Sequence, residues 1–167
     1  GVPAGTIVVT SQPLNTNFEP FYELHILGKP VYRVAEVDET VTEDLYEAAK
    51  SLPENILVVK GKTVTCNDFY EEQARLDGAF CSYTEEEKLA YLRKAYTVGV
   101  RNFEMECTCI AALCRKANIR AAIICVTLVD RLSSDQVTCP PDEYSRFQML
   151  PCKVVTEFLR KHGALCN

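Results

Sequence analysis

The sequence has few of the features that mark several common classes of protein. Its apolar stretches stay well below the roughly 18 residues that a membrane-spanning helix needs. The formal net charge is −5, so no surplus of basic residues indicates a nucleic-acid partner. Only two histidines are present, His25 and His162, and neither belongs to a motif. We therefore expect no membrane span and no nucleic-acid partner, and we assign both histidines structural roles.

Motifs of several enzyme classes are also missing. The chain has no G-x-S-x-G segment of serine hydrolases and no glycine-rich phosphate loop that ends in lysine. Cys107-Thr108-Cys109 is the nearest approach to a metal motif, but no second Cys or His pair stands at ligand spacing. The sequence therefore predicts no metal and no other cofactor.

Cysteine is present but does not suggest disulfides. Several of the nine cysteines lie in apolar or helical runs, where a free thiol behaves as a small hydrophobe. A chain of 167 residues with 47% hydrophobic residues can form a sizeable core without a disulfide framework. We expect a single domain over residues 1–167 and a reducing, cytoplasmic setting.

Strand-like and helix-like patterns alternate along the chain. Strand patterns cover 6–10, 21–26, 30–35, 55–65, 100–105 and 119–129, and helix patterns cover 39–52, 82–98, 107–117 and 145–162. This order predicts an α/β fold with a mixed, mostly parallel sheet flanked by helices. Residues 11–17 read as a loop, and the apolar run 119–129 as a central parallel strand. Pro151 is expected to kink or restart the last helix.

Residues 68–78 carry the most specific chemistry. Gln73 and Arg75 lie two positions apart, so both side chains point the same way in an extended or turn segment. Uracil presents an N–H between two carbonyls, so Gln73 can accept from the N–H and donate to one carbonyl while Arg75 donates to the other. Cytosine lacks this N–H, and the mismatch would leave a buried group unpaired. Taken alone, however, the common pattern Q-x-R favours a polar surface loop with a lone ion pair.

Three polar segments follow the ends of expected strands: the Gln73 segment, Glu104–Glu106 and Asp130–Arg131. In open α/β sheets, ligands bind beyond the carboxyl ends of the strands. We therefore expect the three segments to meet at one rim of the sheet. The paired carboxylates at 104 and 106 could accept hydrogen bonds from a vicinal diol such as that of ribose.

The segments D-F-Y-E-x-Q-x-R-x-D-G (68–78) and N-x-E-M-E (102–106) resemble those of the uridine phosphorylases, animal enzymes in particular, in the nucleoside phosphorylase family. The similarity runs from about Gly5 to the last helix. It implies a nucleoside phosphorylase-like three-layer α/β/α fold and phosphorolysis of uridine to uracil and ribose 1-phosphate in pyrimidine salvage. It also implies phosphate as co-substrate, no cofactor and a homodimer. Because the family's chains are longer, we expect the phosphate-binding half to precede Gly1.

The resemblance also assigns roles to single residues. Gln73 and Arg75 would bind uracil, Met105 and Glu106 would contact the sugar, and Arg131 would reach uracil O4 directly or through water. The other expected substrate contacts are Phe69 as an apolar wall, Glu104 with a less defined role, and Val137 on a mobile loop over 133–141.

One residue departs from the family's pattern. Asp130 stands where many uridine phosphorylases have Asn. It is either one half of a surface ion pair with Arg131 or a sign that purine nucleosides are accepted. Two other functions stay open: a nucleoside hydrolase of the same fold, and a non-catalytic subunit that binds pyrimidines.

Overall fold

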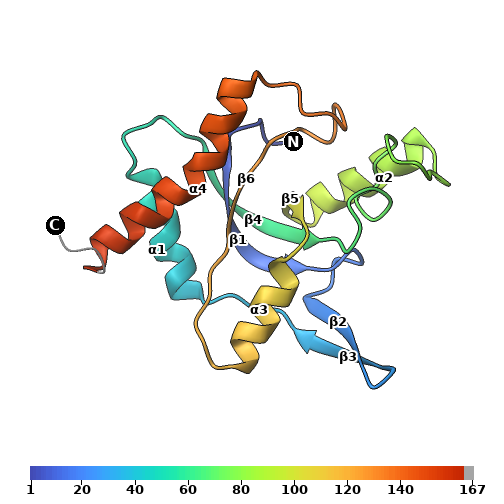
Figure 1. The fold of residues 1–167 in the computed structure, drawn as a ribbon, viewed down its shortest axis with the longest axis horizontal. Helices are drawn as coiled ribbons and strands as arrows, with labels where there is room; N and C mark the ends of the chain where they lie inside the picture. Colours follow the sequence, from blue (N-terminus) through green and yellow to red (C-terminus); the bar gives the residue numbers. More distant parts are fainter. Residues whose placement is uncertain (164–167) are drawn as a thin grey trace.

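A curved four-stranded sheet forms the centre of the chain, and a two-stranded hairpin stands beside it (Figure 1). The computed structural model describes residues 1–163. In chain order its elements are β1 (Ile7–Leu14), β2 (Phe21–Ile26), β3 (Lys29–Val34), α1 (Glu39–Lys50), β4 (Val58–Thr65), α2 (Glu85–Thr97), β5 (Val100–Glu104), α3 (Cys107–Lys116), β6 (Ile124–Val126) and α4 (Pro141–Lys161).

The sheet has the strand order β5-β4-β1-β6. β1, β4 and β5 are parallel, and β6 pairs antiparallel to β1, which confirms the α/β class with a mixed, mostly parallel sheet. The prediction of a central parallel strand over 119–129 is wrong, because β6 has three residues and lies at the edge of the sheet. The run is apolar because it packs on two cores: Ile124 and Val126 contact the α1–α4 core, and Ile123 contacts the α3 core.

The loop expected over 11–17 is shorter than predicted, since β1 continues to Leu14. β6 pairs only with Ile7–Val9, so within the described chain the later part of β1 has a free edge on that side. A proline is tolerated at such an edge because no neighbouring strand needs its missing N–H. Pro13 therefore lies inside β1 and does not end it.

Helices cover both faces of the sheet (Figure 1). α1 and α4 pack together against Ile7 and Val9 of β1. α3 packs against β1 and β4 and against the base of the hairpin, and α2 lies along β5. The hairpin is as predicted, and its turn residues Leu27 and Gly28 have φ angles of 51° and 76°, as two-residue hairpin turns require.

Local sequence signals set most helix ends. Thr84 and Glu87 form a capping box at the start of α2, and Gly99, with φ 98°, follows its end. α4 begins at Pro141, four residues before the predicted start, because proline suits the first helical position. The helix continues through Pro151 and does not restart there.

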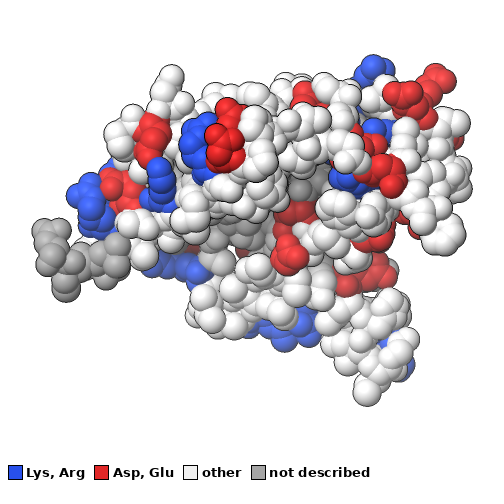
Figure 2. All heavy atoms as spheres, turned by 45° about the horizontal axis from the view of Figure 1, so that its top comes forward, with Lys and Arg blue, Asp and Glu red and all other residues white. Residues whose placement is uncertain are grey.

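Charges of both signs are mixed on the surface of the protein (Figure 2). Figure 2 shows acidic and basic side chains interspersed on one face, with a hollow near its middle and acidic groups beside it. Within residues 1–163, no helix has the length and apolar character of a membrane span. In the same residues, no three His, Cys, Asp or Glu side chains are grouped so as to hold a metal ion.

Candidate functional site

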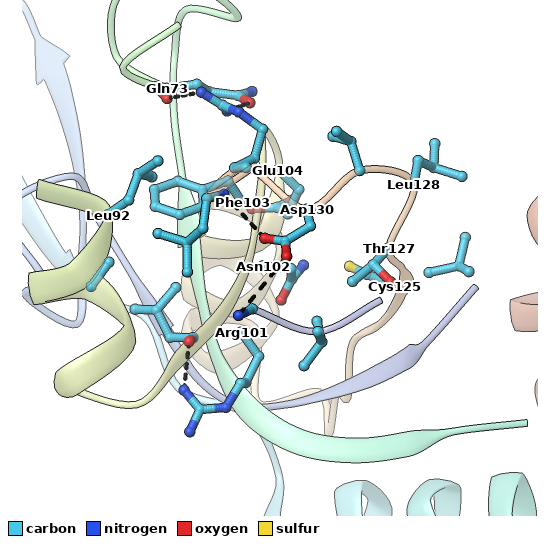
Figure 3. A pocket seen from close by; sticks show the side chains of 18 of the residues that line it. Gln73, Leu92, Arg101, Asn102, Phe103, Glu104, Cys125, Thr127, Leu128 and Asp130 are labelled. Carbon is cyan, nitrogen blue, oxygen red and sulfur yellow. Dashed lines mark hydrogen bonds and ion pairs between the residues drawn. The ribbon is translucent and has the colours of Figure 1, made fainter. Parts of the chain in front are cut away.

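A cavity of about 490 Å³ lies beside β5 and the segment that follows β6 (Figure 3). Its wall includes all eight side chains that the sequence singled out: Phe69, Gln73, Arg75, Glu104, Met105, Glu106, Arg131 and Val137. The structure therefore brings the three predicted segments together. Contact of these side chains with a ligand remains a prediction.

The segments meet for a reason that differs in part from the predicted one. β4 and β5 are parallel, so the loops that follow them leave the same end of the sheet. β6 is antiparallel to β1, which places its carboxyl end at the amino end of the other strands. Arg131 reaches the cavity because the segment after β6 packs on the Gln73 segment, where Arg131 Nη2 donates to the Gln73 carbonyl oxygen at 2.7 Å.

Residues 68–78, called the Gln73 loop below, form a tight turn. The Asp68 carboxylate accepts from the N–H groups of Tyr70 and Glu71 at 2.8 and 2.5 Å. Ala74, between Gln73 and Arg75, has φ 52°, a left-handed conformation. The turn buries both flanking side chains, which are 7% and 8% exposed, and directs them to the cavity wall.

Arg75 is held on three sides. Its Nε and Nη2 donate to the two oxygens of Asp77 at 2.8 and 2.6 Å, and Nη2 also donates to the Asp135 carbonyl oxygen at 2.6 Å. The guanidinium carbon lies 4.5 Å from the centre of the Phe69 ring. The hydrogen bond from Arg75 lowers the pKa of Asp77. Of the three guanidinium nitrogens of Arg75, only Nη1 has no hydrogen-bond partner among the described residues, so its two N–H groups are available to a ligand.

Gln73 is oriented by Arg131. Arg131 Nη1 lies 3.5 Å from Gln73 Oε1, and Nη2 donates to the carbonyl oxygens of Gln73 and Ala74 at 2.7 and 3.3 Å. Arg131 Nε donates to Asp135 Oδ1 at 2.9 Å. Most of its donors are thus used within the protein. These contacts give Arg131 a supporting role, and its predicted contact with uracil O4, directly or through water, stays a prediction.

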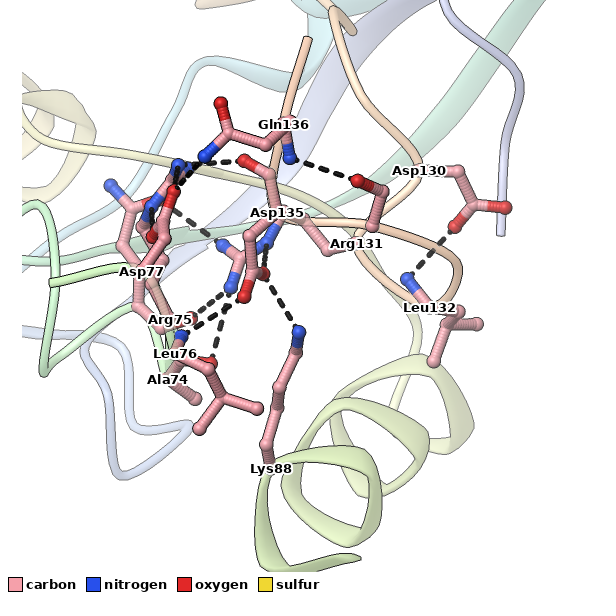
Figure 4. A network of polar contacts seen from close by, with 12 residues as sticks. Ala74, Arg75, Leu76, Asp77, Lys88, Asp130, Arg131, Leu132, Asp135 and Gln136 are labelled. Carbon is pink, nitrogen blue, oxygen red and sulfur yellow. Dashed lines mark hydrogen bonds and ion pairs between the residues drawn. The ribbon is translucent and has the colours of Figure 1, made fainter. Parts of the chain in front are cut away.

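Asp135 connects the Gln73 loop, the segment after β6 and α2 (Figure 4). Its Oδ1 accepts from Lys88 at 2.8 Å and from Arg131, and its Oδ2 accepts from the Leu76 N–H at 2.9 Å. Burial alone would raise the pKa of Asp135. The Leu76 N–H, Lys88 and Arg131 outweigh that effect and hold the pKa below its ordinary value. The segment expected as a mobile loop over 133–141 is therefore fastened to the Gln73 loop.

Sequence reasoning missed Lys88 and Asp135. Lys88 follows three glutamates, a pattern typical of an exposed first turn of a helix, yet its side chain is 8% exposed. Asp135 lies in a polar loop with no motif. The two residues are 47 positions apart, and only their contact in the structure shows that they form a pair. No local pattern in the sequence could have predicted this pair.

Glu104 lines the cavity and also supports the backbone, while its contact with substrate stays a prediction. One carboxylate oxygen accepts from Thr65 at 2.7 Å, and the other accepts from the N–H groups of Glu106 and Cys107, each at 2.7 Å. The last two donors are at the start of α3, whose first N–H groups lack partners in the helix. Burial raises the pKa of Glu104 despite these hydrogen bonds.

Glu106 and Met105 both line the cavity, and their contact with the sugar stays a prediction. The Glu106 side chain is exposed, lines the cavity and makes no capping hydrogen bond to α3. Within residues 1–163 no group donates to its carboxylate, which could accept from two hydroxyls. Met105 is half-buried in the same wall, and Val137 also lines the cavity with 44% of its surface exposed.

Asp130 does not form the ion pair that the sequence suggested. Its Oδ1 accepts from the Leu132 N–H at 3.0 Å and its Oδ2 from Ser133 Oγ at 3.4 Å, which stabilises a turn. The partner of Arg131 is Asp135.

The cavity wall also contains Asn102 and Cys125, which the sequence analysis did not select. Burial raises the pKa of the Cys125 thiol to about 11, so it stays protonated and is a poor nucleophile.

Comparisons with known proteins show the family of the chain. The family model described as the phosphorylase superfamily matches residues 1–160. Inactive uridine phosphorylase B of Schistosoma mansoni is 44% identical over 165 residues, which are 99% of this chain and 56% of that protein. Uridine phosphorylase 2 of Homo sapiens is 41% identical over 167 residues, which are 100% of this chain and 52% of that protein.

A solved structure extends the similarity to the fold. The crystal structure of uridine phosphorylase from Schistosoma mansoni in complex with uracil matches with a TM-score of 0.94 and 45% identity, over 100% of this chain and 58% of that one. The chain spans about half the length of the curated relatives it matches. These matches confirm the nucleoside phosphorylase-like fold and the resemblance first seen in two short motifs. The chain belongs to the phosphorylase superfamily.

Proposed function

We propose that the cavity is the uracil and ribose site of a uridine phosphorylase that acts in pyrimidine salvage. One observation carries the proposal: the buried Gln73 amide, Nη1 of Arg75 and the Glu106 carboxylate share one cavity, and the latter two have no hydrogen-bond partner within residues 1–163. The amide and guanidinium complement the hydrogen-bonding edge of uracil. The carboxylate can accept from both hydroxyls of ribose.

The same geometry suits the reaction. An oxygen of hydrogen phosphate attacks C1′ of uridine, the C1′–N1 bond breaks, and its electron pair passes to the base. The proton that phosphate loses goes to the uracil anion, giving ribose 1-phosphate and uracil. Negative charge grows on the uracil oxygens in the transition state. The donors of Gln73 and Arg75 would stabilise that charge, and the loss of one such donor typically lowers the rate by roughly 10²-fold or more.

The proposal includes partners that the cavity does not hold. Phosphate is the co-substrate and no cofactor takes part. The groups that bind phosphate lie outside this cavity, and part of that site comes from the second subunit of a homodimer. The setting is cytoplasmic.

The test measures uracil released from uridine by the protein at its natural full length, with and without phosphate. We expect release that requires phosphate and yields ribose 1-phosphate in equal amount. Release without phosphate would indicate a hydrolase and overturn the proposal. Gln73→Leu should lower the rate by roughly 10²-fold or more, whereas Gln148→Leu, on the exposed face of α4, should leave it unchanged.

A second function has one observation in its favour. A relative that is 44% identical to this chain bears the name inactive uridine phosphorylase B. A non-catalytic protein that kept the cavity would bind uracil in calorimetry yet release none from uridine. Binding with no phosphate-dependent turnover would therefore favour this second function.

A further inference from the structure

A glutamine amide has two ends, and only one orientation suits uracil. With Oε1 toward ring position 3, the amide accepts from the N–H of uracil. After a half-turn, Nε2 would face that position and would suit the bare ring nitrogen of cytosine instead. The discrimination between the two bases therefore depends on what prevents the Gln73 amide from turning.

Arg131 prevents the turn. Its Nη1 lies 3.5 Å from the side-chain amide of Gln73. Arginine has donors only, so the atom that faces it must be the oxygen, and an amide turned the other way would place N–H against N–H. Because Nη2 also donates to the Gln73 carbonyl oxygen at 2.7 Å, the guanidinium cannot swing aside without releasing the loop.

Arg131 is itself held by two further residues. Asp135 accepts from Arg131 Nε at 2.9 Å and from Lys88 Nζ at 2.8 Å (Figure 4). The side chains of Arg131, Asp135 and Lys88 are 11%, 9% and 8% exposed, so solvent does not strongly screen the attraction between their charges. Asp135 also accepts from the Leu76 N–H, within the Gln73 loop. The chain of contacts runs from α2 to the amide of Gln73 without a gap.

We propose that Lys88 and Asp135 are positioning residues that act through Arg131 to hold the Gln73 amide in the orientation that selects uracil over cytosine. The inference rests on the proposed function, because it assigns uracil to the cavity. Lys88 and Asp135 lie outside the cavity wall. Their proposed effect is on the preference between uracil and cytosine, two bases of nearly equal shape.

The test compares the affinities of uracil and cytosine, by calorimetric titration of the full-length protein. We expect Lys88→Met and Asp135→Asn each to lower the ratio of uracil to cytosine affinity by about tenfold, the effect of one lost hydrogen bond. Lys153→Met is the matched control: Lys153 also pairs with a carboxylate, Glu54, at 2.5 Å, but on the exposed side of α4. Its ratio should equal that of the wild type.

The outcomes separate the inference from the proposed function. A wild-type protein that does not prefer uracil would overturn the proposed function. A wild type that prefers uracil, with variants that lose both affinities equally, would overturn only the inference and leave a purely structural role. If Lys88→Met melts below the assay temperature, Asp135→Asn decides, because it keeps the shape of the side chain and an oxygen for the Leu76 N–H.

Discussion

Arg75 donates two hydrogen bonds to Asp77, from Nε to Oδ1 at 2.8 Å and from Nη2 to Oδ2 at 2.6 Å. These bonds fix one edge of the guanidinium, whereas Nη1 has no partner within residues 1–163. Gln136 also donates to Asp77. A planar two-point pair fixes direction as well as distance. The arginine that would bind uracil is therefore preorganised by a neighbour two residues away.

This arrangement predicts the effect of removing the Asp77 charge. Asp77→Asn can no longer accept at both points, so Arg75 should move away from its present direction. We expect kcat/KM for uridine to fall by about tenfold, as for one displaced hydrogen bond. Asp142→Asn, in the exposed first turn of α4, is the control and should have wild-type kinetics. Equal kinetics in all three proteins would contradict the account of Arg75.

Glu106 is predicted to bind the ribose diol. Glu106→Gln offers a single acceptor oxygen in place of two, so the affinity for uridine should fall by about tenfold. The effect on 2′-deoxyuridine, which has one of the two hydroxyls, should be smaller, and uracil affinity should not change. Glu86→Gln, in α2, is the control. A loss of uracil affinity in Glu106→Gln would place the carboxylate on the base instead.

Glu104 is predicted to matter for stability. Glu104→Ala removes the acceptor for two N–H groups at the start of α3. The free energy of unfolding should fall by about 1–2 kcal/mol, as for a lost helix cap. Denaturant unfolding of the variant and the wild type measures this difference. Unchanged stability together with lost uridine binding would show that Glu104 contacts the substrate and does not stabilise the start of α3.

The lowered pKa of Asp135 predicts that the stability of the fold depends on pH. Its pKa is lower in the folded protein than in the unfolded chain, so its charge stabilises the fold at neutral pH, and that contribution is lost as the pH falls through the lowered folded value. The melting temperatures of the wild type and Asp135→Asn should therefore differ most near pH 7. Below about pH 4 the difference should shrink. A difference that stays constant from pH 7 into acid would show that the carboxylate is not charged in the fold.

Much of the site follows from local sequence. The positions of the Gln73 and Glu106 segments after expected strands predicted that they meet at one rim of the sheet, and the resemblance of both segments to one family assigned them to one substrate. The structure places Gln73, Arg75 and Glu106 in the wall of one cavity. The helix predicted over 82–98 ends within one residue of the observed end of α2 at Thr97, where Gly99 follows, but it begins three residues too early, because the capping residue is Thr84.

The remainder depends on contacts between distant positions. The direction of β6 is set by its pairing with β1, about 117 residues earlier, and an apolar run is compatible with either direction. Glu104 and Glu106 look equivalent in sequence, yet only one faces the start of α3. Lys88 is buried because Asp135 comes to it from another segment, and neither residue carries a local sign of that contact.

The most direct test of the account is the structure of the full-length protein with uracil bound. We predict uracil N3 about 3 Å from Oε1 of Gln73 and a uracil carbonyl oxygen at a similar distance from Nη1 of Arg75. Uracil bound outside this cavity, or bound in it with N3 turned away from Gln73, would contradict the account.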